Sequence, residues 1–308
     1  MWYKWFSIKQ FALLVGLAAL SFTACKKSSS SSNAQYEQLG TTNASDVSSM
    51  ENVNTDIESI GDLSAVIAVG NTGFYGLGNI FQLEGDFDTH HYHHDGNHNG
   101  DDDDDFSRCA MISFNSSLTT RVLTIDFGTS DCTGVDGTNR RGQIIITFTG
   151  NFLDSGSTHT FTFNNYFVND NQLTGSKTVT YTGTNSSGQP TYAINVSDTL
   201  WLGSNNGYLA YNSQRTRTWT QGYNTYKRSD DVFLISGTST TREADGSVIN
   251  ATITNPLQVA PTCKWIEAGT ISFTDQNHNV EYIDYGSGNC DSEAQLTING
   301  HVYNITLH

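Results

Sequence analysis

The chain has 308 residues, and its 31 acidic against 15 basic side chains give a net charge of −16. Nucleic acids are bound by clustered Lys and Arg, so this balance argues against a nucleic-acid partner. Pro is rare, aromatic residues make up 11%, and Gly, Ser, Thr and Asn are abundant. This composition is typical of many short strands joined by tight turns, and it predicts an all-β fold.

The first 24 residues have the layout of a secretory signal. Lys4 and Lys9 form a positive start, and residues 11–22 are then apolar without a charge. Twelve residues of helix reach only about 18 Å, which is short of the hydrocarbon core of a bilayer. We therefore expect residues 1–24 to be a signal peptide that is removed.

The signal ends in Leu20-Ser-Phe-Thr-Ala-Cys25, followed by a polar, Ser-rich stretch. This pattern resembles the lipobox of bacterial lipoproteins. The resemblance implies that Cys25 is lipidated and anchors the chain to a membrane, with residues 25–44 as a tether. Two or three acyl chains give stable anchoring. The alternative is an ordinary secretory signal with an incidental cysteine. Lys26 stands where Asp signals inner-membrane retention, so the resemblance implies the outer membrane, on its periplasmic or cell-surface face.

Residues 45–88 are predicted to hold one amphipathic helix and the first strands. Apolar residues recur every three to four positions, at Val47, Met50, Val53, Ile57, Ile60 and Val66. This period predicts a helix of about 15 residues, with Ser45 or Asp46 as N-cap and Gly61 as its end. Residues 62–88 follow as a possible first strand pair.

Residues 89–106 are rich in His and Asp and form a loop that no core can use. The residues Asp95, Asn97, Asn99, Asp101 and Asp103 resemble the start of a calcium loop, with Gly100 at the sharp turn. Phe106 replaces the Glu that closes such loops. Three alternatives stay open: a solvated linker with no cofactor, a Ca²⁺ site, or transition-metal capture by His90, His91, His93 and His94.

Residues 107–308 are predicted to be an all-β domain because the apolar residues alternate with a period of two. The predicted strands are 143–148, 158–163, 177–182, 191–196, 216–220, 232–235, 248–254, 270–274, 280–284, 295–298 and 302–307. Asp136-Gly137, Asn206-Gly207, Asp245-Gly246 and Asn299-Gly300 are predicted turns. Many strands have Thr on one side and apolar residues on the other, which suits an antiparallel sheet with one wet face. A sandwich and a long twisted meander both fit.

Four further cysteines, Cys109, Cys132, Cys263 and Cys290, are expected to oxidise in an exported chain. Residues 123–132 and 282–290 are similar to each other, and each copy ends in a cysteine with another cysteine upstream. This internal similarity predicts the pairs Cys109–Cys132 and Cys263–Cys290. A four-thiolate zinc site is the weaker alternative, since the C-x-x-C spacing is missing.

Residues 107–308 resemble envelope lipoproteins of Bacteroidota. The resemblance rests on the two similar segments, on the strand Arg140-Arg-Gly-Gln-Ile-Ile-Ile and on the closing stretch Cys290-Asp-Ser-Glu-Ala-Gln-Leu-Thr-Ile-Asn-Gly. The resemblance implies location and fold more than activity.

Motifs of hydrolytic enzymes are missing, which favours a protein without catalytic activity. Asp126 and Asp284 occupy equivalent places in the two similar segments. Paired carboxylates can hydrolyse glycosidic bonds, but equivalent residues in two repeats more often make the same turn or hydrogen bond in each.

Aromatic side chains, among them Trp201, Trp219 and Tyr223, gather in residues 200–226, with Arg215, Arg217 and Arg228 between them. Stacked rings on a sheet face can bind sugars, although core packing explains the same residues. The sequence therefore predicts a membrane-anchored binding or structural module. The alternatives are a glycan-binding or glycan-active accessory protein and a divalent-cation binder. A glycan or protein partner is possible.

Overall fold

The computed structural model describes residues 29–72, 110–116, 121–134, 136–150, 154–225, 228–275 and 279–307. These residues form one long helix, α1 (Ser29–Thr72), and a 14-stranded antiparallel sheet. Apart from the two-residue β3, which pairs with β4, each strand pairs with its neighbours in the sequence, from β1 through β14. The all-β prediction with one N-terminal helix is confirmed at this level.

The strands have these bounds: β1 (Met111–Ser116), β2 (Arg121–Asp126), β3 (Cys132–Thr133), β4 (Asn139–Thr149), β5 (Thr158–Val168), β6 (Asn171–Thr184), β7 (Pro190–Trp201), β8 (Tyr208–Gln221), β9 (Val232–Glu243), β10 (Val248–Val259), β11 (Ala268–Thr274), β12 (Val280–Ser287), β13 (Glu293–Ile298) and β14 (His301–Thr306). All eleven predicted strands coincide with strands of the sheet. β1 and β2 were not predicted. Short 3-10 turns occur at Gly203–Asn205 and Arg228–Asp230.

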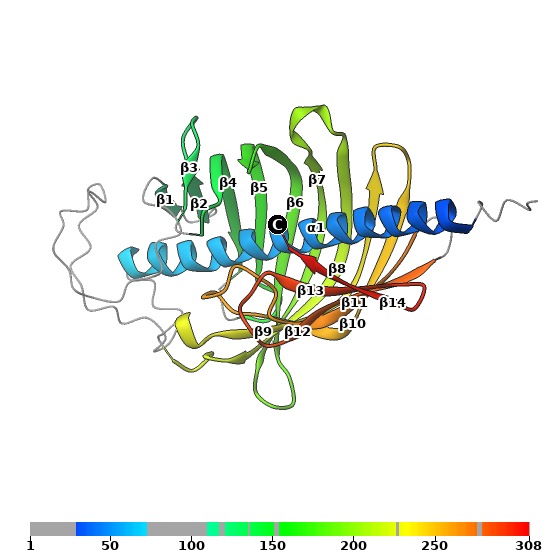
Figure 1. Ribbon diagram of the computed structural model, residues 1–308. Helices are drawn as coiled ribbons and strands as arrows, with labels where there is room; N and C mark the ends of the chain where they lie inside the picture. Colours follow the sequence, from blue (N-terminus) through cyan, green and yellow to red (C-terminus); the bar gives the residue numbers. More distant parts are fainter. Residues whose placement is uncertain are drawn as a thin grey trace, which may run out of the picture.

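Figure 1 shows α1 crossing the strands, with the sheet curved around it. Between Asn43 and Asp62 every helix residue except Ser45 is buried or half-buried. A helix of a two-layer protein normally keeps one face in water, so this pattern means that the sheet encloses the helix on several sides.

Two apolar clusters hold the helix. One contains Met50, Ile57 and Ile60 with side chains from β2 to β8. The other contains Ala44 and Val47 with side chains from β9 to β14. At 3.6 residues per turn these two sets lie on different faces of α1. The two halves of the sheet are therefore joined through the helix.

The helix is longer than the sequence predicted, since α1 has 44 residues. It begins at Ser29, inside the predicted tether, and it runs through Gly61, which was expected to end it. A Cβ at Gly61 would overlap the Phe161 ring, so Gly61 permits close packing and is not a cap. The enclosed segment is held by tertiary contacts, and adding turns to an existing helix needs no new nucleation. The expected first strand pair is not formed in residues 62–72, and residues 73–88 lie outside the described part.

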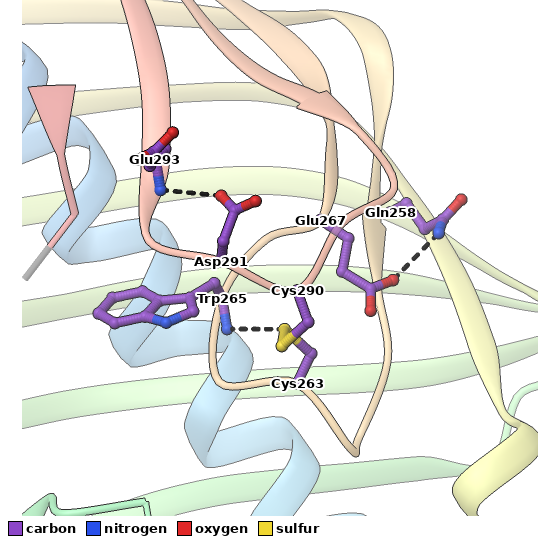
Figure 2. The surroundings of a disulfide bond; sticks show 7 residues. All are labelled: Gln258, Cys263, Trp265, Glu267, Cys290, Asp291 and Glu293. Carbon is purple, nitrogen blue, oxygen red and sulfur yellow. Dashed lines mark hydrogen bonds between the residues drawn. A yellow bond between two sulfur atoms is a disulfide. The ribbon is translucent and has the colours of Figure 1, made fainter. Parts of the chain in front are cut away.

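The disulfide Cys263–Cys290 forms, as the internal similarity predicted, with Cα atoms 5.6 Å apart. Figure 2 shows that it ties the loop after β10 to the loop before β13. In the first loop the Trp265 amide donates a hydrogen bond to Cys263 Sγ, and in the second the Glu293 amide donates to Asp291. Cys132 is also disulfide-bonded. Its predicted partner, Cys109, lies outside the described residues.

Candidate binding surface

The sheet has an inner face toward α1 and an outer face toward solvent, and strand β8 shows both. Its odd-numbered residues from Leu209 to Arg217 are buried, whereas Asn212, Gln214 and Thr216 are exposed. The pleat of a strand sends alternate side chains to opposite faces, so the register of the sheet assigns every strand residue to one face.

The aromatic residues singled out in the sequence do not share one groove. Trp201, at the end of β7, pairs with Tyr208, at the start of β8, and both lie on the outer face. Trp219 is eleven residues further along β8, about 36 Å away, and on the inner face. There it packs against Phe233 and donates to Asp231. Tyr223 is half-buried in the loop after β8. Of these three aromatic residues, Trp201 is the one that is exposed on the outer face of the sheet.

Arg215 and Arg217, expected to support the aromatic site, are buried against the helix. The Arg215 guanidinium donates to Glu51, Ser239 and the Tyr211 hydroxyl. Arg217 Nη1 lies 2.7 Å from Glu58 Oε1 and Nη2 lies 2.6 Å from Asp62 Oδ2. Arg228 is in a short turn, and its side chain lies outside the described residues.

Lys177 on β6 completes this buried ionic network. Its ammonium group donates to Glu58 Oε2 at 2.7 Å and to the carbonyl of Asn54 at 2.7 Å. In the same half of the sheet, Arg140 on β4 bridges Asp56 and Asp136. The sequence did not predict this network. One signal was available, because Glu51 and Glu58 are seven residues apart and so lie on the same helix face, which is also the face of Ala44 and Val47.

Asp198 on β7 is the least compensated charge of the inner face. It is 4% exposed, and neither of its carboxylate oxygens accepts a well-formed hydrogen bond from a residue in the described part of the chain. Burial raises the pKa of Asp198 to about 7, against the opposing attraction of Asn54 and Lys177. Burial also raises the pKa values of Asp46 and Glu281 to about 7, each with a nearby carboxylate as the second cause.

The outer face is built differently, from uncharged polar side chains in register. One row crosses eleven strands from β4 to β14 through directly paired residues. Its members are Thr147, Thr160, Thr178, Asn195, Gln214, Thr238, Thr252, Ser272, Tyr282, Thr297 and Val302. None of these residues carries a charge at neutral pH, although the protein as a whole is strongly acidic.

Within this face, one region has polar groups that are free to bind. We define the outer strip as Trp201, Tyr208, Ser197, Asn212, Asn195 and Gln214 on β7 and β8. These residues form three cross-strand pairs, with Trp201 opposite Tyr208, Ser197 opposite Asn212 and Asn195 opposite Gln214. The pair Thr199–Ala210 lies between the first pair and the second. Ser197, Asn212, Asn195 and Gln214 are exposed, and none of these four side chains bonds to another described residue.

Elsewhere on the outer face, neighbouring polar side chains satisfy one another. Thr160 bonds to Thr178, and Thr240 bonds to Asn250. Gln143 donates to Asp126 and accepts from Asn164. The outer strip therefore combines amides whose donors and acceptors are unused with an exposed aromatic pair.

The aromatic end of the strip is held in place. Trp201 is 47% exposed, yet its indole Nε1 donates to Thr174 Oγ1 at 3.1 Å. Its ring centroid is 5.2 Å from that of Tyr208. The pair thus presents an ordered apolar surface, and the six residue steps along β7 from Trp201 to Asn195 give the strip a length of about 20 Å.

The two carboxylates of the similar segments do not form a catalytic pair. Asp126 Oδ1 accepts from the Gly128 amide at 2.8 Å, and Asp284 Oδ1 accepts from the Gly286 amide at 2.9 Å. They lie on β2 and β12, nine strands apart in the sheet order. Each makes the same turn in its own segment, as the structural interpretation predicted.

The remaining candidate residues lie outside the described residues. These are Cys25 and the metal candidates Asp95, Asn97, Asn99, Asp101 and Asp103, so their predicted roles stay predictions. The residues that are described contain no group of three or more His, Cys, Asp or Glu arranged to hold a metal ion. In the described part of α1, no stretch is long and apolar enough to cross a membrane.

Comparisons with known proteins do not add to this picture: no family model, curated protein or solved structure matches the chain.

Proposed function

We propose that this protein is a lipid-anchored envelope protein that binds a neutral glycan through the outer strip. The glycan is supported by one observation: an ordered aromatic pair and four amide and hydroxyl side chains without a partner among the described residues lie together on the outer face of β7 and β8. The anchor is supported by the lipobox pattern that ends at Cys25.

A sugar matches both parts of the strip. The C–H face of a sugar ring stacks on Trp201 and Tyr208, since aromatic rings supply a large apolar surface of defined geometry. Sugar hydroxyls both donate and accept, and so do the amides of Asn195, Asn212 and Gln214. The strip has neither Lys nor Arg, so it offers no charge to a phosphate or a sulfate.

The length of the strip selects an oligosaccharide over a single sugar. Adjacent strands are about 4.8 Å apart, and residues two apart on a strand are about 6.7 Å apart. A chain of several sugar rings laid along β7 and β8 contacts the aromatic pair at one end and the amide pairs at the other. The role is binding without catalysis, as Asp126 and Asp284 are both engaged in turns.

The glycan is tested by screening the purified full chain against neutral oligosaccharides and then measuring the best one by calorimetry. Trp201→Ala is expected to weaken binding at least tenfold, about 1.4 kcal/mol, because stacking on the indole is lost. Asn212→Ala should weaken it less. Thr252→Ala is the matched control, since it lies on the same outer face two strands beyond β8. Equal affinity of the Trp201 variant and the wild type would overturn the proposal.

The anchor is tested separately, by growing cells that express the full chain with a labelled fatty acid. The label should enter the protein and disappear in Cys25→Ala, which should also leave the membrane fraction. Unlabelled wild-type protein in a cell that labels other lipoproteins would overturn the anchor and leave the glycan site untouched.

A further inference from the structure

The exposed apolar side chains of this protein are concentrated at the end from which the helix leaves the sheet. In the described part of the chain, the large hydrophobic residues classed as exposed are Leu39, Met111, Trp201, Val280, Tyr282 and Val302. Trp201 belongs to the outer strip. Val280, Tyr282 and Val302 lie on strands close to the point where α1 leaves the sheet, as the contacts of Gly40 show. Leu39 lies on α1, on the inner side of these strands, and is not part of the same surface.

Gly40 marks where α1 passes the last strands. A Cβ on Gly40 would meet the side chains of Ile298 and Glu281, so the helix backbone lies directly against β12 and β13 there. Leu39 precedes Gly40, and Val280 and Tyr282 stand on either side of Glu281. Val302 is opposite Thr297, the residue before Ile298.

On the outer face of these strands the apolar residues are contiguous. Tyr282 is opposite Thr297, which in turn is opposite Val302, so the two apolar side chains are separated by one threonine. Val280 is two residues along β12 and faces the same side. Val302 is 59% exposed, Val280 47% and Tyr282 43%. β14 is also the last strand of the sheet, so its outer backbone edge has no partner strand among the described residues.

The predicted anchor is attached to this same end. α1 begins at Ser29, four residues after Cys25, and Gly40 follows eleven residues later. Eleven residues of helix span about 17 Å. In Figure 1 the first turns of α1 project past the sheet on the side of the β13–β14 hairpin. A short helical connection cannot hold the domain far from the bilayer, as a long flexible tether would.

We propose that Val280, Tyr282 and Val302 form a membrane-contact surface, which rests the domain on the bilayer in a fixed orientation. This inference rests on the proposed lipid anchor. Aliphatic side chains beside a tyrosine suit the boundary between headgroups and acyl chains, where tyrosine is enriched. The outer strip, five strands away in the sheet order from β12 to β7, stays clear of the lipid and open to a glycan.

The charges around the surface select the kind of lipid. Asp284 lies two residues beyond Tyr282 on the same face, and Glu293 lies on β13; both are exposed. The surface itself contains no Lys or Arg. An anionic headgroup would be repelled, so the contact is with zwitterionic lipid, and it is driven by apolar burial and insensitive to salt.

The test uses the full, lipidated chain in vesicles of phosphatidylcholine and phosphatidylethanolamine. Val302→Cys and, as a matched control, Ser197→Cys are each labelled with an environment-sensitive dye. Both positions are exposed on the outer face. On reconstitution the emission at position 302 should shift to the blue and be quenched severalfold by lipids that carry a quencher in the acyl chain, alike at low and high salt. The emission at position 197 should stay unchanged.

Three results would overturn the proposal. Mass spectrometry first verifies that the protein is acylated. Equal, unquenched emission at positions 302 and 197 in that protein would then show that the domain does not contact the membrane. Quenching only in vesicles with added anionic lipid would show an electrostatic contact. A blue shift that depends on protein concentration in detergent without lipid would show a second copy of the chain at this surface.

Failure of the anchor itself gives a different result. The wild type would then lack acyl chains, and the labelled proteins would be added to the same vesicles as soluble proteins. Selective quenching at position 302 at high lipid concentration would support the contact surface, and its loss in Tyr282→Asn would tie it to these side chains. No quenching would reject the surface as well.

Discussion

The two faces of the sheet use polar residues in opposite ways. The inner face encloses Lys177, Arg215 and Arg217, each paired with a carboxylate of α1. The central row of the outer face carries uncharged side chains, and in the outer strip Ser197 and the amides have no partner among the described residues. The difference shows that exposure to water does not by itself decide where charged side chains lie in this sheet. Charged side chains of the inner face bind the helix, and neutral side chains of the outer strip remain available for a ligand.

The largest loss of stability is expected from a substitution of Glu58, which binds both Lys177 and Arg217 on the inner face. Glu58→Ala leaves two buried cations without this partner, and we expect it to lower the free energy of unfolding by about 4 kcal/mol. Urea unfolding measures the loss. The control is Asp131→Ala, which removes a pair with Arg141 in which Asp131 is 44% exposed and which should cost less than about 1 kcal/mol. Similar losses for the two variants would contradict the ionic network as a structural element.

The disulfide Cys263–Cys290 joins two loops and belongs to neither face of the sheet, so its contribution to stability is a reference for the effects expected on the two faces. Replacing Cys263 and Cys290 together by Ser opens a loop closed across 27 residues. The loop-entropy relation predicts a loss of about 3.5 kcal/mol. Thermal unfolding with and without reductant measures it: the wild type should lose stability on reduction more than the double variant does.

Asp198 differs from the other charged residues of the inner face because removing its charge is expected to stabilise the protein. Its pKa is raised to about 7 from the 3.8 of an ordinary Asp, so the folded protein holds this proton more tightly than the unfolded chain does. Its contribution to stability is therefore fully present below about pH 4 and is lost as the pH rises through 7. Asp198→Asn removes the buried charge and should stabilise the protein by about 2 kcal/mol at pH 8, with little effect at pH 4.

Urea titrations of both proteins from pH 4 to pH 8 check this prediction. Asp46 and Glu281 also have raised pKa values, so only the difference between variant and wild type reports on Asp198. A destabilised variant at pH 8 would mean that the attraction of Lys177 for the carboxylate outweighs the cost of burial.

The smallest effect is expected on the outer face. Gln214 is exposed and bonds to no described residue, so Gln214→Ala should change the free energy of unfolding by less than about 0.5 kcal/mol. Glycan affinity should fall all the same. A large loss of stability would mean that the outer strip serves the fold and not a ligand.

Much of the fold could be predicted from the sequence because local patterns set it. Alternation located eleven strands, and the Asn299-Gly300 turn has the positive φ values, 51° and 79°, that its residue types allow. The pair Cys263–Cys290 followed from an internal similarity, and so did the matching turns at Asp126 and Asp284. The β1 and β2 strands were missed, as were the additional residues of β8, whose polar and aromatic side chains blur the alternation.

The sequence by itself determined the class of the fold, the strand positions and the side of each strand on which Thr lies, because these depend on residues close together in the chain. Only the tertiary structure decided that the sheet encloses α1. That enclosure turns Gly61 from an expected cap into a packing position and buries Arg215 and Arg217 against helix carboxylates. These results depend on contacts between residues 100 or more positions apart, and no local pattern encodes which strand meets which helix face.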